Sequence, residues 1–313
     1  MFSNNQRNNE LEFPPTSGTQ LKDLSTDGIQ SSYIRRILFR PFDYRYTYYS
    51  GKHNRLIERN RYDVMKHALY NNFCLLSSRQ CKESYKHVFI SDSICALNVT
   101  GNAGSFGANH VFPLYLYPDE HKEDIFAETE RQYNIEPKLL EQFRAKWQGF
   151  EPEQLFYYIY AVLHSPSYRN RYAQYLRMDF PRIPFTEDYK LFAAMAALGK
   201  DLADLHLLKS PLLDPPLVKY HGSGSNDRVD ELSYDPASGT LRINPDKYFE
   251  GISPEIWNFH IGGYQVMHKY LKDRKGKSLA DPIHYCRIAT ALAHTINLQN
   301  KVDILYQQVD EGK

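Results

Sequence analysis

The sequence predicts an α+β fold, with a mixed β-rich part, helical packing, a β-hairpin and C-terminal helices in separate blocks. Residues 31–118 are rich in β-branched and aromatic runs, and residues 119–210 show helical periodicity. The hairpin is expected within residues 211–250 and the last helices within residues 251–309. Segregated strands and helices are typical of α+β proteins, whereas a doubly wound sheet needs the two to alternate.

The β-rich part follows a polar N-terminal segment. Residues 1–30 contain Asn, Ser, Thr and Pro with few large apolar side chains, so we expect a disordered or linker segment there. One helix is expected at residues 61–71, and residues 100–110 form a Gly-rich loop. Apolar and aromatic runs predict strands at residues 34–39, 44–49, 73–77, 87–91, 94–99 and 111–117.

Helices of the later blocks are predicted from proline positions and apolar spacing. Pro152 stands where a helix begins. From Leu191 to Leu205 an apolar residue recurs every three or four positions, which indicates a core-facing helix over residues 187–208. Further strands are predicted at residues 228–234 and 240–243, around a turn at 235–239, and further helices at 257–271 and 285–305.

Composition is that of an ordinary soluble globular protein. Of 313 residues, 42% are hydrophobic and 24% charged, with a net charge of +1. The four cysteines form no C-x-x-C pair and are too few for a disulfide framework. No apolar run approaches the roughly 20 residues that cross a bilayer, and the N-terminus does not resemble a signal peptide. We expect a cytoplasmic protein with no membrane partner.

Positive charge is concentrated in two clusters that also contain aromatic rings. An acidic stretch at residues 119–153 balances them, so any anionic ligand must meet one face only. Cations among flat rings are typical of nucleic-acid binding, although two solvated charged faces would give the same pattern. The first basic cluster is Arg35, Arg36, Arg40, Arg45, Lys52, Arg55, Arg59 and Arg61, and the second is Lys269, Lys272, Arg274, Lys275 and Lys277.

Two further features could contact a nucleic acid. Gly262 and Gly263 are expected to begin the helix of the second basic cluster, where exposed N–H groups would bind a phosphate. A helix kink or close packing is the alternative explanation for these glycines. Loop residues that could reach base edges are Arg79, Gln80, Lys82, Asn98, Asn102 and Asn109.

Motifs for catalysis are absent from the sequence. It contains no G-x-x-x-x-G-K-[ST], no G-x-G-x-x-G and no N-P-P-[YF], and its histidines show no metal-ligand spacing. We therefore expect no catalytic residue, no metal site and no cofactor in this chain. The competing hypothesis is a small Mg²⁺-dependent nuclease that uses Asp92, Glu120 and Lys122. Glu120 fits a helix start at least as well.

Six strings in order give the chain a family resemblance over residues 31–309. It resembles the C-terminal specificity region of type ISP restriction–modification enzymes. The strings are FRPFDYRYTYY (39–49), HVFIS (87–91), FPLYLYP (112–118), YAVLHSPSYR (160–169), DFPRIPF (179–185) and IGGYQV (261–266) followed by LKDRKG (271–276).

The resemblance implies a target-recognition domain for double-stranded DNA. In that family one polypeptide joins this region to a nuclease, a helicase-like ATPase motor and an adenine-N6 methyltransferase. S-adenosylmethionine, ATP and Mg²⁺ would belong to those parts, in cis or on another chain. The basic clusters would then hold phosphates and the loop residues would read bases. A protein-interaction module that kept the fold remains a third hypothesis.

Overall fold

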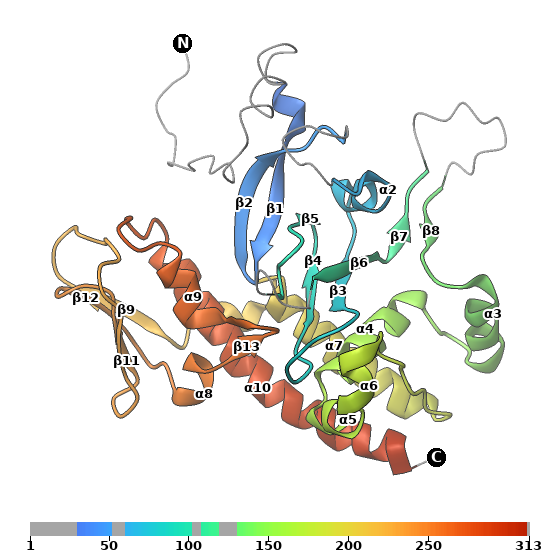
Figure 1. The fold of residues 1–313 in the computed structure, drawn as a ribbon. Coiled ribbons are helices and arrows are strands. Elements are labelled where there is room, and N and C mark those ends of the chain that lie inside the picture. The colour runs from blue at the N-terminus through green and yellow to red at the C-terminus, as the bar shows by residue number, and fades with distance from the viewer. Residues whose placement is uncertain (1–29, 52–59, 102–107, 119–129, 312–313) are drawn as a thin grey trace.

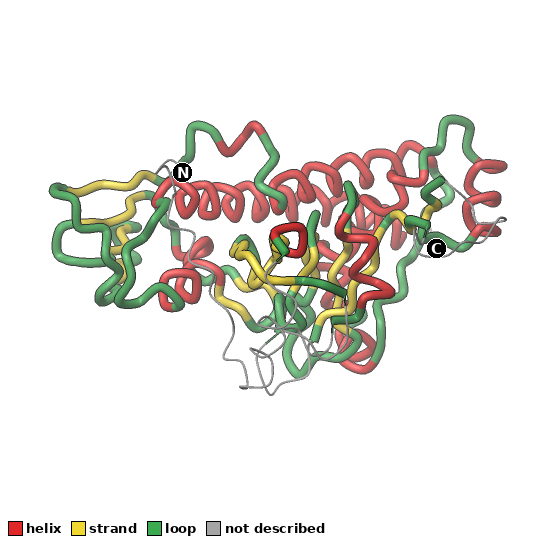
Figure 2. Tube along the Cα trace, turned by 90° about the horizontal axis from the view of Figure 1, so that it is seen from above, coloured by secondary structure: helices red, strands yellow, loops and turns green. Residues whose placement is uncertain are grey.

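The computed structural model describes residues 30–51, 60–101, 108–118 and 130–311. Small sheets lie at the centre, helices at one end and a four-stranded sheet at the other, as Figure 1 shows. The helix α10 (Pro282–Glu311) runs along the molecule past all three. Figure 2 shows the central strands on one side of the long helices. The predicted α+β class is confirmed.

Two three-stranded sheets form the centre of the described structure. In the first, β1 (Ile34–Arg40) pairs antiparallel with β2 (Asp43–Tyr48) and parallel with β5 (Ile94–Cys95). In the second, β3 (Cys74–Ser78) lies between β4 (Val88–Ser91) and β6 (Asn109–Pro113). We call the pair of β1 and β2 the ribbon. The first four predicted strands agree with these bounds to within one residue.

Hydrogen bonds from two asparagines explain where the local predictions were wrong. The helix expected at 61–71 is only α2 (Tyr62–Met65) and the 3-10 turn η2 (Lys66–Leu69). It ends there because the Asn72 amide donates to the His67 and Tyr115 carbonyls. The strand expected at 94–99 stops at Cys95, since the Asn109 side chain accepts the Val99 N–H.

The end of the β-rich part also differs from the prediction. The strand expected at 111–117 divides, and its second half is β7 (Tyr115–Leu116). β7 pairs with β8 (Gln132–Tyr133), which lies inside the segment expected to be wholly helical. The 3-10 turn η1 (Ser31–Tyr33) precedes the ribbon.

The helices of the middle block follow the predicted pattern from residue 137 onward. Helices α4 (Pro152–His164) and α7 (Tyr189–His206) pack so closely at Gly199 that an added Cβ would lie 1.9 Å from the Tyr157 carbonyl oxygen. On α7, Met195, Leu202 and Leu205 are buried, which confirms the core-facing stripe. The other helices of this block are α3 (Pro137–Lys146), α5 (Pro166–Arg171) and α6 (Ala173–Met178).

The hairpin expected within residues 211–250 is part of a larger antiparallel sheet. Its strand order is β10-β11-β12-β9, so two strands flank the predicted pair on one side. Arg228 belongs to no strand of this sheet and forms an isolated bridge with Ser278 instead. The strands are β9 (Lys219–Gly222), β10 (Ser233–Asp235), β11 (Thr240–Arg242) and β12 (Lys247–Glu250), and the 3-10 turn η3 (Pro211–Leu213) precedes them.

The helix expected at residues 257–271 is interrupted. α8 (Pro254–Trp257) ends early, and β13 (His260–Ile261) and β14 (Tyr264–Gln265) form a hairpin before α9 (Val266–Lys272) begins. The chain reverses at Gly262, whose φ of 57° belongs to the left-handed region that glycine adopts without strain.

One large core connects these blocks, and a small second cluster of Tyr49, Ala68, Cys74 and Ile94 lies beside the ribbon. The large core runs from Leu38 on the ribbon to Val309 on α10. The Phe42 ring packs edge-on against Phe89, with ring centres 5.1 Å apart, and against His206 of α7 at 6.0 Å. The changes of structure near residues 118, 210 and 250 therefore do not separate independent cores. Within the described chain, no helix is both long and apolar enough to span a bilayer.

Candidate nucleic-acid interface

The outer part of the ribbon presents two accessible arginines. The Arg36 guanidinium lies over the Tyr44 ring, with its carbon 3.5 Å from the ring centre. Stacking on a ring orders the side chain while its N–H groups stay available. Arg35 is exposed and has no polar partner among the described residues. These two residues of the first basic cluster are the best placed to meet an external anion.

The inner arginines of the ribbon are used by the protein itself. Arg40 and Arg45 flank the Phe39 ring, at 4.9 and 3.9 Å from its centre. Arg40 also donates to the carbonyl oxygen of Asn98. Both side chains are only partly exposed. Their predicted phosphate contacts would require these internal contacts to be given up.

The two basic clusters meet at a buried carboxylate. Asp43, 1% exposed, accepts from Arg45 Nη2 at 3.0 Å and from Arg274 Nη2 at 2.7 Å. Arg274 also donates to the Tyr270 carbonyl and lies 3.6 Å above the Tyr270 ring. Burial alone would lower the pKa of Arg274, but Tyr270 and Asp43 outweigh it and raise that pKa. We call this arrangement the Asp43 bridge.

The Asp43 bridge corrects the role predicted for Arg274. Its guanidinium is largely enclosed and already has an anionic partner, so it holds α9 against the ribbon instead of facing a phosphate. Lys272 and Lys275 of the second basic cluster are exposed, as is Lys277, whereas Lys269 is half-buried. The accessible charge of this cluster therefore lies at the end of α9 and in the turn after it.

Most of the predicted base-reading residues contact the protein itself. Arg79 Nε lies 2.9 Å from Asp179 Oδ1, and both side chains are more than half exposed. Gln80 donates its amide N–H to the Met178 carbonyl at 3.2 Å. These contacts tie the loop after β3 to the end of α6. The ion pair of Arg79 with Asp179 is solvated, so Arg79 can exchange this partner for another at little cost. Lys82 is exposed.

The prediction that Asn109 reads bases is wrong. Its side chain is buried, and its amide oxygen accepts the Val99 N–H at 2.8 Å while its amide N–H donates to Ala96. Asn98 is partly buried and supplies the carbonyl that Arg40 contacts. Arg61 is exposed, just before α2. Four predicted contact residues lie outside the described residues, namely Lys52, Arg55, Arg59 and Asn102.

The expected phosphate site at Gly262 and Gly263 is also wrong. The Gly262 N–H donates to the Lys86 carbonyl at 2.7 Å, and the Gly263 N–H donates to the Thr100 carbonyl at 3.1 Å. Neither N–H begins a helix, since α9 starts only at Val266. These glycines dock the β13–β14 hairpin onto the β-rich block, which is the close packing considered as the alternative.

Replacing Gly262 with alanine is expected to lower the free energy of unfolding by about 2 to 4 kcal/mol. An added Cβ would lie 1.8 Å from the Thr100 carbonyl oxygen, on a backbone with positive φ. The control is Gly224→Ala, where φ is 72° but no atom lies within 4 Å of the added Cβ. Urea unfolding of both variants separates the collision from the backbone strain. Equal losses would contradict the docking role.

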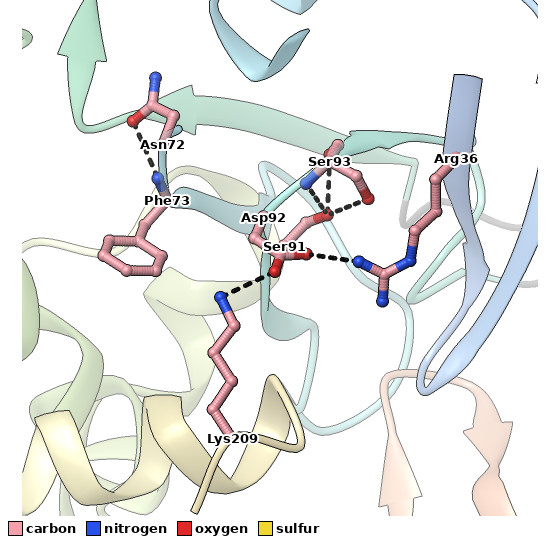
Figure 3. Close-up of polar contacts among 7 residues, drawn as sticks. All are labelled: Arg36, Asn72, Phe73, Ser91, Asp92, Ser93 and Lys209. Atoms are coloured by element: carbon pink, nitrogen blue, oxygen red, sulfur yellow. Dashed lines mark hydrogen bonds and ion pairs between the residues drawn. The ribbon is translucent and has the colours of Figure 1, made fainter. Parts of the chain in front are cut away.

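Asp92 brings together two cations from distant parts of the chain. The Ser91 hydroxyl donates to the Ser93 carbonyl at 2.8 Å and accepts the Ser93 N–H at 3.2 Å, which fixes the turn around Asp92. Figure 3 shows Arg36 and Lys209 approaching its carboxylate from two sides. Arg36 Nη1 lies 3.3 Å from Oδ1, and Lys209 Nζ lies 2.8 Å from Oδ2.

Lys209 is a candidate residue that sequence reasoning missed. It belongs to neither basic cluster, and in the sequence it is an isolated lysine that follows an apolar helix. Leu208, with φ of 55°, ends α7 in a left-handed turn that directs the chain toward Asp92. We call Asp92, Arg36 and Lys209 the Asp92 cluster.

These contacts also bear on the nuclease hypothesis. Both Asp92 oxygens face cations, a setting that disfavours a bound Mg²⁺. Glu120 and Lys122 lie outside the described residues. Among the residues that are described, no three His, Cys, Asp or Glu side chains are placed to hold a metal ion.

Residues 2–301 match the sequence model of the type ISP C-terminal specificity domain. The chain belongs to this family. The resemblance carried by the six strings is thereby confirmed. No curated protein matches the chain.

Solved structures share the fold of this specificity domain. One is the ATP-dependent type ISP restriction–modification enzyme LlaBIII bound to DNA, with a TM-score of 0.70 and 19% identity over 92% of this chain and 20% of that one. The DrdV–DNA complex has a TM-score of 0.69 and 21% identity, over 90% of this chain and 29% of that one. A nuclease-deletion mutant of the type ISP enzyme LlaGI in complex with a DNA substrate mimic has a TM-score of 0.65 and 20% identity. The match covers 90% of this chain and 22% of that one. This chain thus spans less than a third of each of these proteins.

Proposed function

We propose that this specificity domain binds double-stranded DNA and selects its sequence for a type ISP restriction–modification enzyme. The observation that carries the proposal is the family match over residues 2–301. Its support from the structure is the Asp43 bridge, which joins the two basic clusters at one place. The similar folds belong to proteins solved with DNA.

The exposed cations and the loop residues take different roles in this proposal. Arg35, Arg36 and Lys209 bind phosphates from the ribbon side, and Lys272 and Lys275 bind them from the end of α9. These contacts set position and contribute affinity without choosing a sequence. Sequence choice falls to loop residues, of which Arg79 is the best placed because a solvated pair holds it and arginine recognises guanine.

Catalysis, in this proposal, belongs to other parts of the enzyme. The methyltransferase, motor and nuclease would lie in cis or on another chain and would bind S-adenosylmethionine, ATP and Mg²⁺. We expect the specificity domain to act in the cytoplasm, where its DNA is, and to cleave or methylate nothing by itself.

Binding of the purified domain to a pool of random-sequence duplexes tests this function. We expect salt-dependent binding in which log K falls against log salt by about 0.9 for each phosphate contact. Repeated selection from the pool should enrich one sequence. A single-stranded pool of the same length is the control, and we expect it to bind more weakly. Binding to neither pool, or binding without enrichment of any sequence, would contradict the proposal.

A further inference from the structure

The Asp92 cluster holds two exposed cations on one enclosed anion. The side chains of Arg36 and Lys209 are 44% and 49% exposed, whereas that of Asp92 is 17% exposed. The three groups together carry one surplus positive charge. The two cations can therefore face solvent and each contact one oxygen of the same carboxylate.

The surroundings hold the carboxylate in place and leave the cations accessible to solvent. All four residues of β4 are buried, and the Ser91–Ser93 hydrogen bonds close the turn that presents Asp92. Arg36 lies on Tyr44, which gives its guanidinium a second contact that does not depend on Asp92. Burial and the nearby Asp92 charge raise the pKa of Tyr44, so its hydroxyl stays neutral and does not compete as an anion.

We propose that Asp92 competes with DNA phosphate for Arg36 and Lys209, and so limits binding to DNA of the wrong sequence. The inference rests on the proposed function. It adds a specificity residue that touches no base and acts through the two cations that it holds.

The physical reason lies in how loose and matched complexes use charge. In a loose complex a phosphate stays separated by water, and its attraction depends on net local charge, which Asp92 reduces from two to one. In a matched complex the other contacts hold the backbone in register, and direct charge-assisted hydrogen bonds replace weak solvated ion pairs. The carboxylate therefore disfavours the loose complex more than the matched one.

The variant that tests this inference is Asp92→Asn, measured on random duplexes and on the duplex enriched by selection. We expect random duplexes to bind about threefold to tenfold tighter, with a salt slope steeper by about 0.9. The enriched duplex should gain about twofold or less, so the ratio between the two affinities falls. Asp92→Glu keeps the charge and should behave as the wild type.

A matched control separates the local effect from a change of overall charge. Glu187→Gln removes one negative charge and releases Lys146 of α3 from its ion pair. Glu187 lies just before α7 begins, whereas Lys209 follows the opposite end of that helix. We expect Glu187→Gln to leave both affinities unchanged. If Asp92→Asn binds random duplexes no tighter than the wild type, or tightens both duplexes equally, the inference is overturned while the proposed function stands. A wild-type domain that binds no duplex overturns both.

Discussion

Replacing Asp43 with alanine is expected to lower the free energy of unfolding by about 3 to 5 kcal/mol. The substitution removes the carboxylate that holds the largely enclosed Arg274 guanidinium. Enclosed cations without a counter-charge are costly because water cannot reach them fully. Since Arg274 holds α9 against the ribbon, the contact between the two basic clusters should weaken as well.

Urea unfolding of Asp43→Ala, compared with Asp179→Ala, measures this effect. Asp179 makes a solvated ion pair with Arg79, so its loss should cost far less than the loss of Asp43. Combining Asp43→Ala with Arg274→Leu should recover part of the loss, because the unpaired cation is then removed. If Asp43→Ala costs no more than Asp179→Ala, the bridge does not hold the two clusters together.

Replacing Arg35, Arg36 and Lys209 together with glutamine is expected to weaken binding to every duplex, and to the enriched duplex by about 1,000-fold or more. Each lost phosphate contact should cost about 1.5 kcal/mol and make the salt slope shallower by about 0.9. Glutamine keeps an amide N–H at positions 36 and 209 as a donor to Asp92, so the fold should persist. Random duplexes should lose less affinity than the enriched duplex, because only the matched complex contacts Arg36 and Lys209 directly.

The control for this triple variant removes the same charge elsewhere. Three exposed cations on α3, α5 and α7 make ion pairs there. The pairs are Lys146 with Glu187, Arg171 with Asp310 and Lys200 with Asp204. Joint replacement of the three cations with glutamine should reduce affinity only slightly, through the longer-range field. Equal losses from the two triple variants would show that net charge, and not the ribbon surface, determines binding.

Several elements could be predicted because their information is local. The β-branched and aromatic runs in residues 34–49 and the apolar spacing from Leu191 to Leu205 identify the ribbon and α7 without any distant contact. The helix expected at 257–271 was wrong for the converse reason. The chain reverses at Gly262 because the Lys86 and Thr100 carbonyls accept the N–H groups of Gly262 and Gly263. Lys86 and Thr100 lie far earlier in the chain.

The candidate site was predicted in outline but not in its assignments. The amide of Asn109 is of the kind that pairs with a base edge, yet it bonds to the Val99 N–H and the Ala96 carbonyl of its own loop. Lys209 was overlooked because a single lysine after a helix has no local signature. Arg79 and Gln80 lie on an exposed loop as expected, but their contacts to Asp179 and Met178 could not be read from spacing.

The sequence by itself determined the family, the α+β class and the two clusters of positive charge, because composition, order and periodicity are properties of the chain alone. Only the tertiary structure decided which cations remain available. Arg274 meets Asp43 across 231 residues, and Arg36 meets Asp92 across 56. Whether an arginine faces water or a carboxylate depends on which distant segment packs beside it, and a count of charges along the chain does not contain that contact.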